Sequence, residues 1–136
     1  MNKISGPLLD RIDIHIEVAP VKYEKLQNNE LAESSFEIKK RVNTARKIQY
    51  ERYKDYGILS NSELTPKLIN KFCTLGEHEK KLLQDAFKKL GLSARAYGRI
   101  LKLARTIADL DSSDNINTAH IAEAIQYRSL DRKFWS

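Results

Sequence analysis

Hydrophobic residues alternate strictly with polar ones over residues 12–18, near the start of the chain. On an extended backbone, one face of this segment would carry Ile12, Ile14, Ile16 and Val18. This period is typical of a half-buried β-strand. No later segment has a strand pattern that would pair with it, and a single strand has no ladder partners. We therefore expect the strand to come from a sheet whose other strands lie outside this sequence, and the chain to be the end of a larger protein.

Beyond this strand, the apolar positions recur at helical spacing. The pattern predicts a polar connector over residues 21–33, a helical domain of about five helices over residues 34–128, and a tail over residues 129–136. Residues 1–20 are expected to be extended or disordered without their sheet. The expected fold class is all-α, a small helical bundle preceded by an orphan β-strand or extended segment. The predicted helix caps are Ser34 or Ser35, Thr65 followed by Pro66, Ser93, and Asn117, and the predicted stops are Gly57 and Gly91.

Charge and composition indicate which partners and which cellular compartment to expect for this domain. The 24 Lys and Arg exceed the 18 Asp and Glu, so the net charge is +6 and the pI is about 9.4. This balance permits a polyanionic partner such as nucleic acid or nucleotide, without requiring one. The single cysteine, Cys73, is expected to be a buried, reduced thiol. The sequence contains no run of about 18 apolar residues and no signal-peptide pattern, so we expect a cytoplasmic protein with no membrane contact.

The sequence shows no enzyme active site of its own. It contains no phosphate-binding loop of the Gly-x-x-x-x-Gly-Lys-Ser/Thr type and no Walker B motif. Its three histidines have no metal-ligand spacing, so no metal site is expected. Two arginines remain as candidates. Arg11 precedes the alternating segment, and Arg95 lies in the first turn of a predicted helix, where the helix dipole disfavours a cation. Position alone is also compatible with two solvated surface side chains.

Three stretches carry a family resemblance: ISGPLLDRIDIHIEV (residues 4–18), LSARAYGRILKLARTIADL (residues 92–110) and AHIAEAIQYR (residues 119–128). Together, and in this order, they resemble the C-terminal part of the magnesium-chelatase-like AAA+ ATPases of the ComM/YifB family. The resemblance implies that the orphan strand is the last strand of the ATPase core and that the helices form its lid domain. The Walker motifs would then lie outside this sequence.

The resemblance also implies roles for individual residues. Arg11 takes the place of the arginine finger, which reaches ATP bound to the adjacent subunit. Arg95 takes the place of sensor 2, which contacts the ATP of its own subunit. Arg99 and Arg105 are possible interface residues on the same helix. ATP and magnesium are expected in the full-length parent, and neither is expected to bind tightly to this chain, which should be inactive by itself.

The function implied is that of a lid and subunit-interface module in an ATP-dependent ring, expected to be a hexamer that acts on DNA in recombination or transformation. Two alternatives stay open. One is a basic helical module that binds nucleic acid through the helix predicted at about residues 36–55, although its basic residues are expected to spread around the helix. The other is the lid of a true magnesium chelatase subunit.

Overall fold

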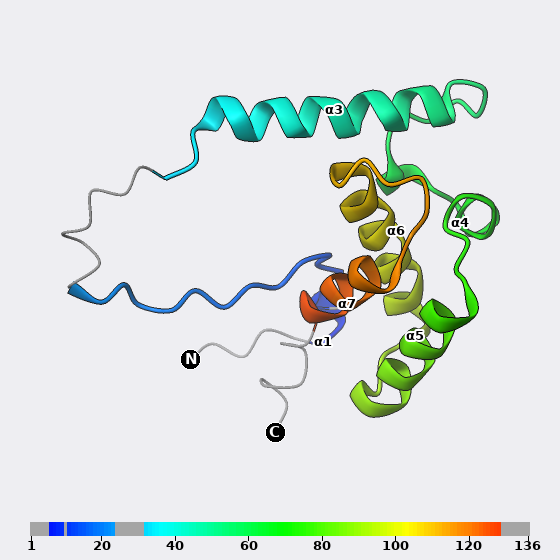
Figure 1. The fold of residues 1–136 in the computed structure, drawn as a ribbon. Helices are drawn as coiled ribbons and strands as arrows, with labels where there is room; N and C mark the ends of the chain where they lie inside the picture. The colour runs from blue at the N-terminus through cyan, green and yellow to red at the C-terminus, as the bar shows by residue number, and fades with distance from the viewer. Residues whose placement is uncertain (1–5, 10, 24–31, 129–136) are drawn as a thin grey trace.

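The structure is a computed structural model that describes residues 6–9, 11–23 and 32–128 (Figure 1). The described residues form helices and no β-strand, which confirms the expected all-α bundle, and helices α3 to α7 match the five predicted ones. None of these helices is long and apolar enough to cross a membrane. The helices are α1 (Gly6–Leu9), α3 (Ser35–Tyr53), the 3₁₀ helix η1 (Asn61–Glu63), α4 (Pro66–Phe72), α5 (Glu77–Leu90), α6 (Ala94–Leu110) and α7 (Thr118–Gln126).

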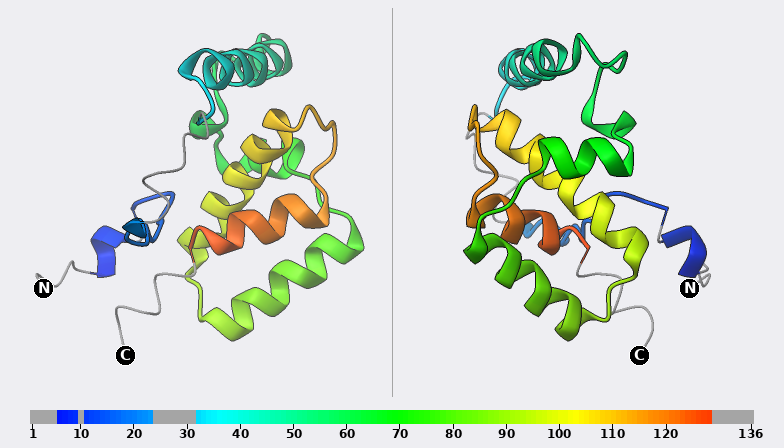
Figure 2. Two further views of the ribbon diagram at one scale, coloured as in Figure 1. Left: turned by 60° about the vertical axis from the view of Figure 1, so that its left-hand side comes forward. Right: turned by 90° about the vertical axis from the view of Figure 1, so that its right-hand side faces the viewer.

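Helix α6 is the centre of the bundle. It packs against α7, α3, α4 and η1, and α5 packs against α7 (Figures 1 and 2). Small and branched apolar residues recur on its inner face, where Ile100, Ala104 and Ala108 are completely buried. Alanines at these positions allow neighbouring helices to approach closely, so one helix can contact several others.

The predicted caps form as expected, because each depends only on residues within one turn. The hydroxyl of Ser34 accepts a hydrogen bond from the Glu37 N–H (3.3 Å), and that of Ser93 accepts one from the Ala96 N–H (3.2 Å). Gly91 ends α5 in the left-handed region, at φ 57°. These caps fix the helix boundaries and hence the register of the side chains described below.

Helix α7 begins with a reciprocal cap that the sequence did not suggest. The Asn117 side chain accepts a hydrogen bond from the His120 N–H (3.2 Å), while His120 Nδ1 accepts one from the Asn117 N–H (3.1 Å). The other ring nitrogen, Nε2, lies 3.0 Å from Asp111 Oδ2. His120 is therefore buried, and its side chain supports the start of α7.

Helix α3 lies across one end of α6 and extends beyond the bundle (Figure 1). Its buried residues, Ala45, Gln49 and Tyr53, all belong to its C-terminal half. The apolar positions nearer its start, Ile38 and Val42, are each 44% exposed. Helix α3 therefore packs against the bundle only over its second half.

Residues 12–20 form no β-strand in this structure. They run as an irregular, extended segment, and the alternating apolar side chains that a sheet would cover are exposed, from 40% at Ile12 to 86% at Val18. The assignment of residues 1–20 to the last strand of a larger sheet stays a prediction. The tail at residues 129–136 and most of the predicted connector, residues 24–31, lie outside the described residues.

Candidate functional site

A groove of about 520 Å³ runs along α6 from Arg95 to Thr106. One wall is α6 itself, which contributes Arg95, Arg99 and Lys102, and the facing wall comes from η1 and α4. The three cations are spaced i, i+4 and i+7, so they share one face of the helix. The groove therefore has one continuous cationic wall.

Arg95 lies at the N-terminal end of this wall. It is exposed in the first turn of α6, directly after the Ser93 cap. Within the described part of the chain, its guanidinium has no hydrogen-bond or ion-pair partner. The first amides of a helix add positive potential at the same end. The local field and the unpaired side chain together favour an anion here.

Arg99 connects the groove to the N-terminal segment. Its Nη1 forms an ion pair with Asp13 Oδ1, and its side chain is 27% exposed. Lys102 is held in a similar way, because its ammonium donates to the Ser62 carbonyl oxygen (2.9 Å). Arg99 and Lys102 are therefore both engaged by other residues of the chain. Arg95 is left as the cation of this wall that is available to a ligand.

Arg11 is exposed in the turn that follows α1, where its N–H donates to the Leu8 carbonyl oxygen (3.0 Å). It does not line the groove. Only one residue, Ile12, lies between it and Asp13, so the two Cα atoms are at most about 7 Å apart. The Asp13–Arg99 ion pair thus tethers the Arg11 segment to α6.

A second tether joins this segment to the end of α7. Arg128, which is 1% exposed, donates from Nη1 to the Ile12 carbonyl oxygen (2.8 Å), and the His15 N–H donates to the Tyr127 carbonyl oxygen (2.8 Å). Sequence reasoning missed Arg128, because an arginine just past a helix end gives no periodic signal. The quoted motif that ends at this residue was the only indication.

Arg105 has a different environment from the other arginines of α6. It is 3% exposed, and it donates to Asp109 Oδ1 (3.1 Å) and to the carbonyl oxygens of Asp114 (2.9 Å) and Ser113 (2.6 Å). Its guanidinium is therefore committed to holding the loop between α6 and α7. Among the described residues, no group of three or more His, Cys, Asp or Glu side chains could hold a metal ion.

Two protein families match this chain, one over the helical bundle and one over the N-terminal segment. The family described as magnesium chelatase, subunit ChlI C-terminal, matches residues 32–128, which include the whole bundle. The chain belongs to this family. A second family, described as magnesium chelatase, subunit ChlI, matches residues 1–26, which include Arg11 and the tethered residues Ile12, Asp13 and His15. The expected resemblance to magnesium-chelatase-like proteins is confirmed.

Individual relatives place the chain with ComM and YifB. It is 42% identical over 133 residues to competence protein ComM of Haemophilus influenzae, and 41% identical over 133 residues to YifB of Salmonella typhimurium. YifB of Escherichia coli is 40% identical over 134 residues. Each alignment covers 97% of this chain but only 25–26% of the relative. The chain thus spans about a quarter of the length of these curated relatives.

Proposed function

We propose that this chain is the lid and subunit-interface module of an ATP-dependent AAA+ motor, and that Arg95 contacts the terminal phosphate of ATP bound by its own polypeptide. The observation that supports this most directly is the unpaired, exposed Arg95 guanidinium at the start of α6, where it lines a cationic groove. Helix N-termini bind phosphate through their free amides and their dipole, and an arginine there adds a permanent positive charge. This is the role of sensor 2.

Arg11 is proposed as the arginine finger that acts on ATP held by the neighbouring subunit. It is exposed, and it lies in the segment that matches the ChlI family. A guanidinium suits this role, because phosphoryl transfer spreads negative charge over oxygens that a fixed cation can stabilise. ATP and Mg²⁺ would be held by the motor core of a ring, proposed to be a hexamer, and Arg99 would help to position the finger segment.

The proposed physical substrate of the motor is DNA, and the proposed location is the cytoplasm. One of the relatives is named a competence protein, which fits a process that handles DNA. The lid of a true magnesium chelatase subunit is the competing assignment, since both matched families carry that name. DNA-stimulated ATP hydrolysis would favour the first assignment, and porphyrin-dependent ATP hydrolysis would favour the second.

Steady-state ATP hydrolysis tests the two arginines in a polypeptide that joins this chain to the ATPase core of its family. Arg11→Ala and Arg95→Ala should each fold and lose most of the turnover, by about 100-fold or more for the finger. Lys81→Ala, an exposed charge on α5, is the matched control and should keep its rate. A near wild-type rate in either arginine variant would remove the role proposed for that residue.

A mixing experiment separates the two roles. An arginine finger acts in trans, so Arg11→Ala subunits, whose own nucleotide sites are intact, should regain activity when mixed with subunits that cannot bind ATP but keep Arg11. The same mixture made with Arg95→Ala should not recover, because sensor 2 acts on its own subunit. Recovery of both variants, or of neither, would contradict the assignment.

A further inference from the structure

The outward side of α3 carries one row of residues at helical spacing. We call this the outer row, and it consists of Phe36, Lys40, Asn43, Lys47 and Tyr50. The intervals i, i+4, i+7, i+11 and i+14 keep its members on one face over about 21 Å of helix. All five are exposed, and they lie on the side turned away from the buried residues of α3.

The structure sorts the basic residues of α3 into two groups. Arg41 pairs with Glu33, Arg52 with Asp109, and Lys54 with Glu51. Lys40 and Lys47 of the outer row, and the adjacent Lys39, have no ion-pair partner in the described part of the chain. Of the four basic residues of α3 without an ion pair in the described part of the chain, three, Lys39, Lys40 and Lys47, lie on or beside the outer row. The fourth, Arg46, lines a separate pocket with Ala45 and Gln49.

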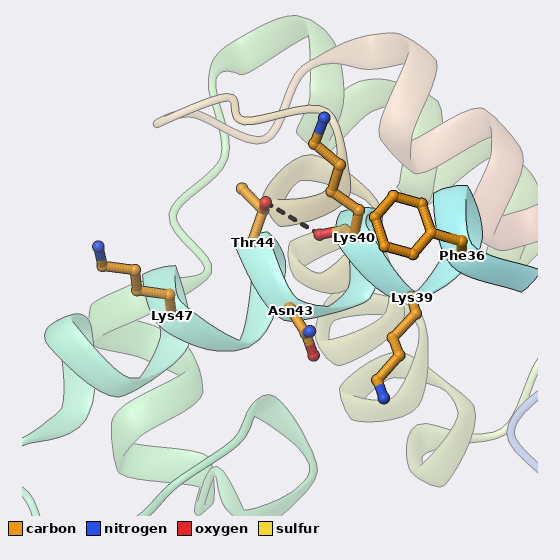
Figure 3. A pocket seen from close by; sticks show the side chains of 6 residues that line it. All are labelled: Phe36, Lys39, Lys40, Asn43, Thr44 and Lys47. Carbon is orange, nitrogen blue, oxygen red and sulfur yellow. Dashed lines mark hydrogen bonds between the residues drawn. The ribbon is translucent and has the colours of Figure 1, made fainter.

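These lysines surround a shallow surface depression of about 480 Å³ (Figure 3). Its other lining residues are Phe36, Asn43 and Thr44, and no carboxylate lines it. The Thr44 hydroxyl donates to the Lys40 carbonyl oxygen (3.0 Å), so it is satisfied within the helix. The depression therefore presents three ammonium groups, one amide and one aromatic ring, which is complementary to a negatively charged and partly aromatic ligand.

The aromatic members of the outer row are unusually exposed. Phe36 is 73% exposed and Tyr50 is 54% exposed, and the first half of α3 extends beyond the bundle (Figure 1). A phenyl ring gains free energy when it leaves water, so Phe36 favours a partner that can cover it. A nucleobase can do so by stacking, and the phosphates that accompany it can reach the neighbouring lysines.

We propose that the outer row of α3 binds single-stranded nucleic acid, with Lys40 and Lys47 on the phosphates and Phe36 and Tyr50 stacked against bases. Cations combined with aromatic faces, here two lysines between two rings, are the means by which proteins hold single strands without reading sequence. Bases of a duplex are already stacked on one another, so the rings favour a single strand. The proposal rests on the proposed action of the motor on DNA, and it assigns contact with the DNA to the lid domain.

The test is fluorescence anisotropy of a labelled oligonucleotide of about 20 thymidines, titrated with the 136-residue chain at several salt concentrations and without ATP. The charge variant is Lys40→Ala/Lys47→Ala. Its matched control is Lys81→Ala/Lys88→Ala, which removes two exposed lysines seven residues apart on α5. The stacking variant is Phe36→Ala/Tyr50→Ala. All six positions are exposed, and circular dichroism checks that each variant is folded.

The two kinds of contact should respond differently. Loss of two phosphate contacts should make the slope of log K against log salt shallower by about 1.4, at about 0.7 for each contact with a single strand. Loss of the rings should weaken binding about fivefold or more at every salt concentration and leave the slope unchanged. The control pair should bind like the parent chain.

Three results would overturn the proposal: no binding near physiological salt, an equal loss in the control pair, or tighter binding of a duplex that is insensitive to the two rings. An equal loss in the control would mean that the partner responds only to net charge. Because no nucleotide is present, these outcomes are independent of the roles proposed for Arg11 and Arg95. The ATPase experiments can fail while this proposal stands, and the reverse.

Discussion

Arg52 of α3 and Asp109 of α6 form a two-point ion pair that joins elements 57 residues apart. Arg52 Nη1 lies 3.0 Å from Asp109 Oδ2, and Nη2 lies 2.5 Å from Oδ1. Asp109 is completely buried, and it also accepts hydrogen bonds from Arg105 Nε (3.1 Å) and Asn61 Nδ2 (2.9 Å). Burial opposes the charge of Arg52, but the hydrogen bonds and charge of Asp109 outweigh it and raise the pKa of the arginine. One carboxylate therefore fastens α3 to the bundle.

Asp109→Asn should destabilise the chain by about 3–5 kcal/mol. The amide keeps the size of the carboxylate, but it leaves two arginines without their counter-charge, and an unpaired buried charge is costly. Urea unfolding followed by circular dichroism measures the effect. Glu51→Gln, which breaks the exposed pair with Lys54, is the control and should change stability by less than about 0.5 kcal/mol. Equal effects in the two variants would mean that the buried network contributes no more than a surface pair.

The helix caps of this fold were predictable from the sequence, and the buried hydrogen-bond network around Asp109 was not. The Ser34, Ser93 and Asn117 caps follow from residues within one turn, so the sequence indicates them directly. Asp109 meets Arg52 and Asn61 only after α3 and η1 have packed against α6, and nothing in their spacing indicates this. Tyr97 shows the same limit. It is spaced three and seven residues from the buried Ile100 and Ala104, which suggests a core position, yet it is 44% exposed and contacts Phe87 edge-on.

The candidate site divides in the same way. The helical position of Arg95 follows from the Ser93 cap, and the structure places it in an exposed first turn as predicted. The ion pair of Arg99 with Asp13 spans 86 residues, and no periodic pattern indicates it. The alternation over residues 12–18 predicts a sheet environment, and the part of the chain that the structure describes contains no strand, so sequence period and observed burial differ there.

Cys73 should react slowly with thiol reagents in the folded chain. It is 4% exposed, and burial raises the pKa of its thiol from 9.0 to about 11. A shift of about two units lowers the thiolate fraction about 100-fold at pH 8, and the thiolate is the reactive form. Labelling of the folded chain should therefore be at least about 100-fold slower than in urea. Comparable rates in the two states would show that the thiol is neither shielded nor shifted.

The same shift predicts how stability depends on pH. The unfolded thiol ionises near pH 9.0 and the folded thiol near 11, so the folded state holds the proton more tightly between these values. The contribution of Cys73 is therefore fully present below pH 9 and is lost as pH rises from 9 to 11. Cys73→Ala should show a smaller alkaline fall in the free energy of unfolding than the parent chain. An identical fall in both would contradict the assignment.

Two glycines beside the same turn should respond to alanine in opposite directions. A Cβ at Gly98, inside α6, would lie 3.6 Å from Ile69 Cδ1, which is an ordinary contact. Gly98→Ala should therefore stabilise the chain by about 0.5–1 kcal/mol through helix propensity. Gly91 has φ 57°, so Gly91→Ala should destabilise it by about 1 kcal/mol. Urea unfolding of both variants measures these changes, and a loss of stability in Gly98→Ala would indicate that α6 and α4 are packed more tightly than this contact suggests.

Arg128→Ala should release the segment that carries Arg11. The buried guanidinium holds the Ile12 carbonyl oxygen, and the neighbouring Tyr127 carbonyl oxygen accepts from the His15 N–H. Loss of a charged hydrogen bond is worth about 1.5–3 kcal/mol, so the His15 amide should exchange with deuterium about tenfold faster or more. Amides of α5 serve as an internal reference, and Lys67→Ala, an exposed charge on α4, as the control variant. Faster exchange at His15 with unchanged exchange at the α5 amides would show that only this segment is released. A uniform increase in exchange would mean that Arg128 supports the whole bundle and does not specifically hold this segment.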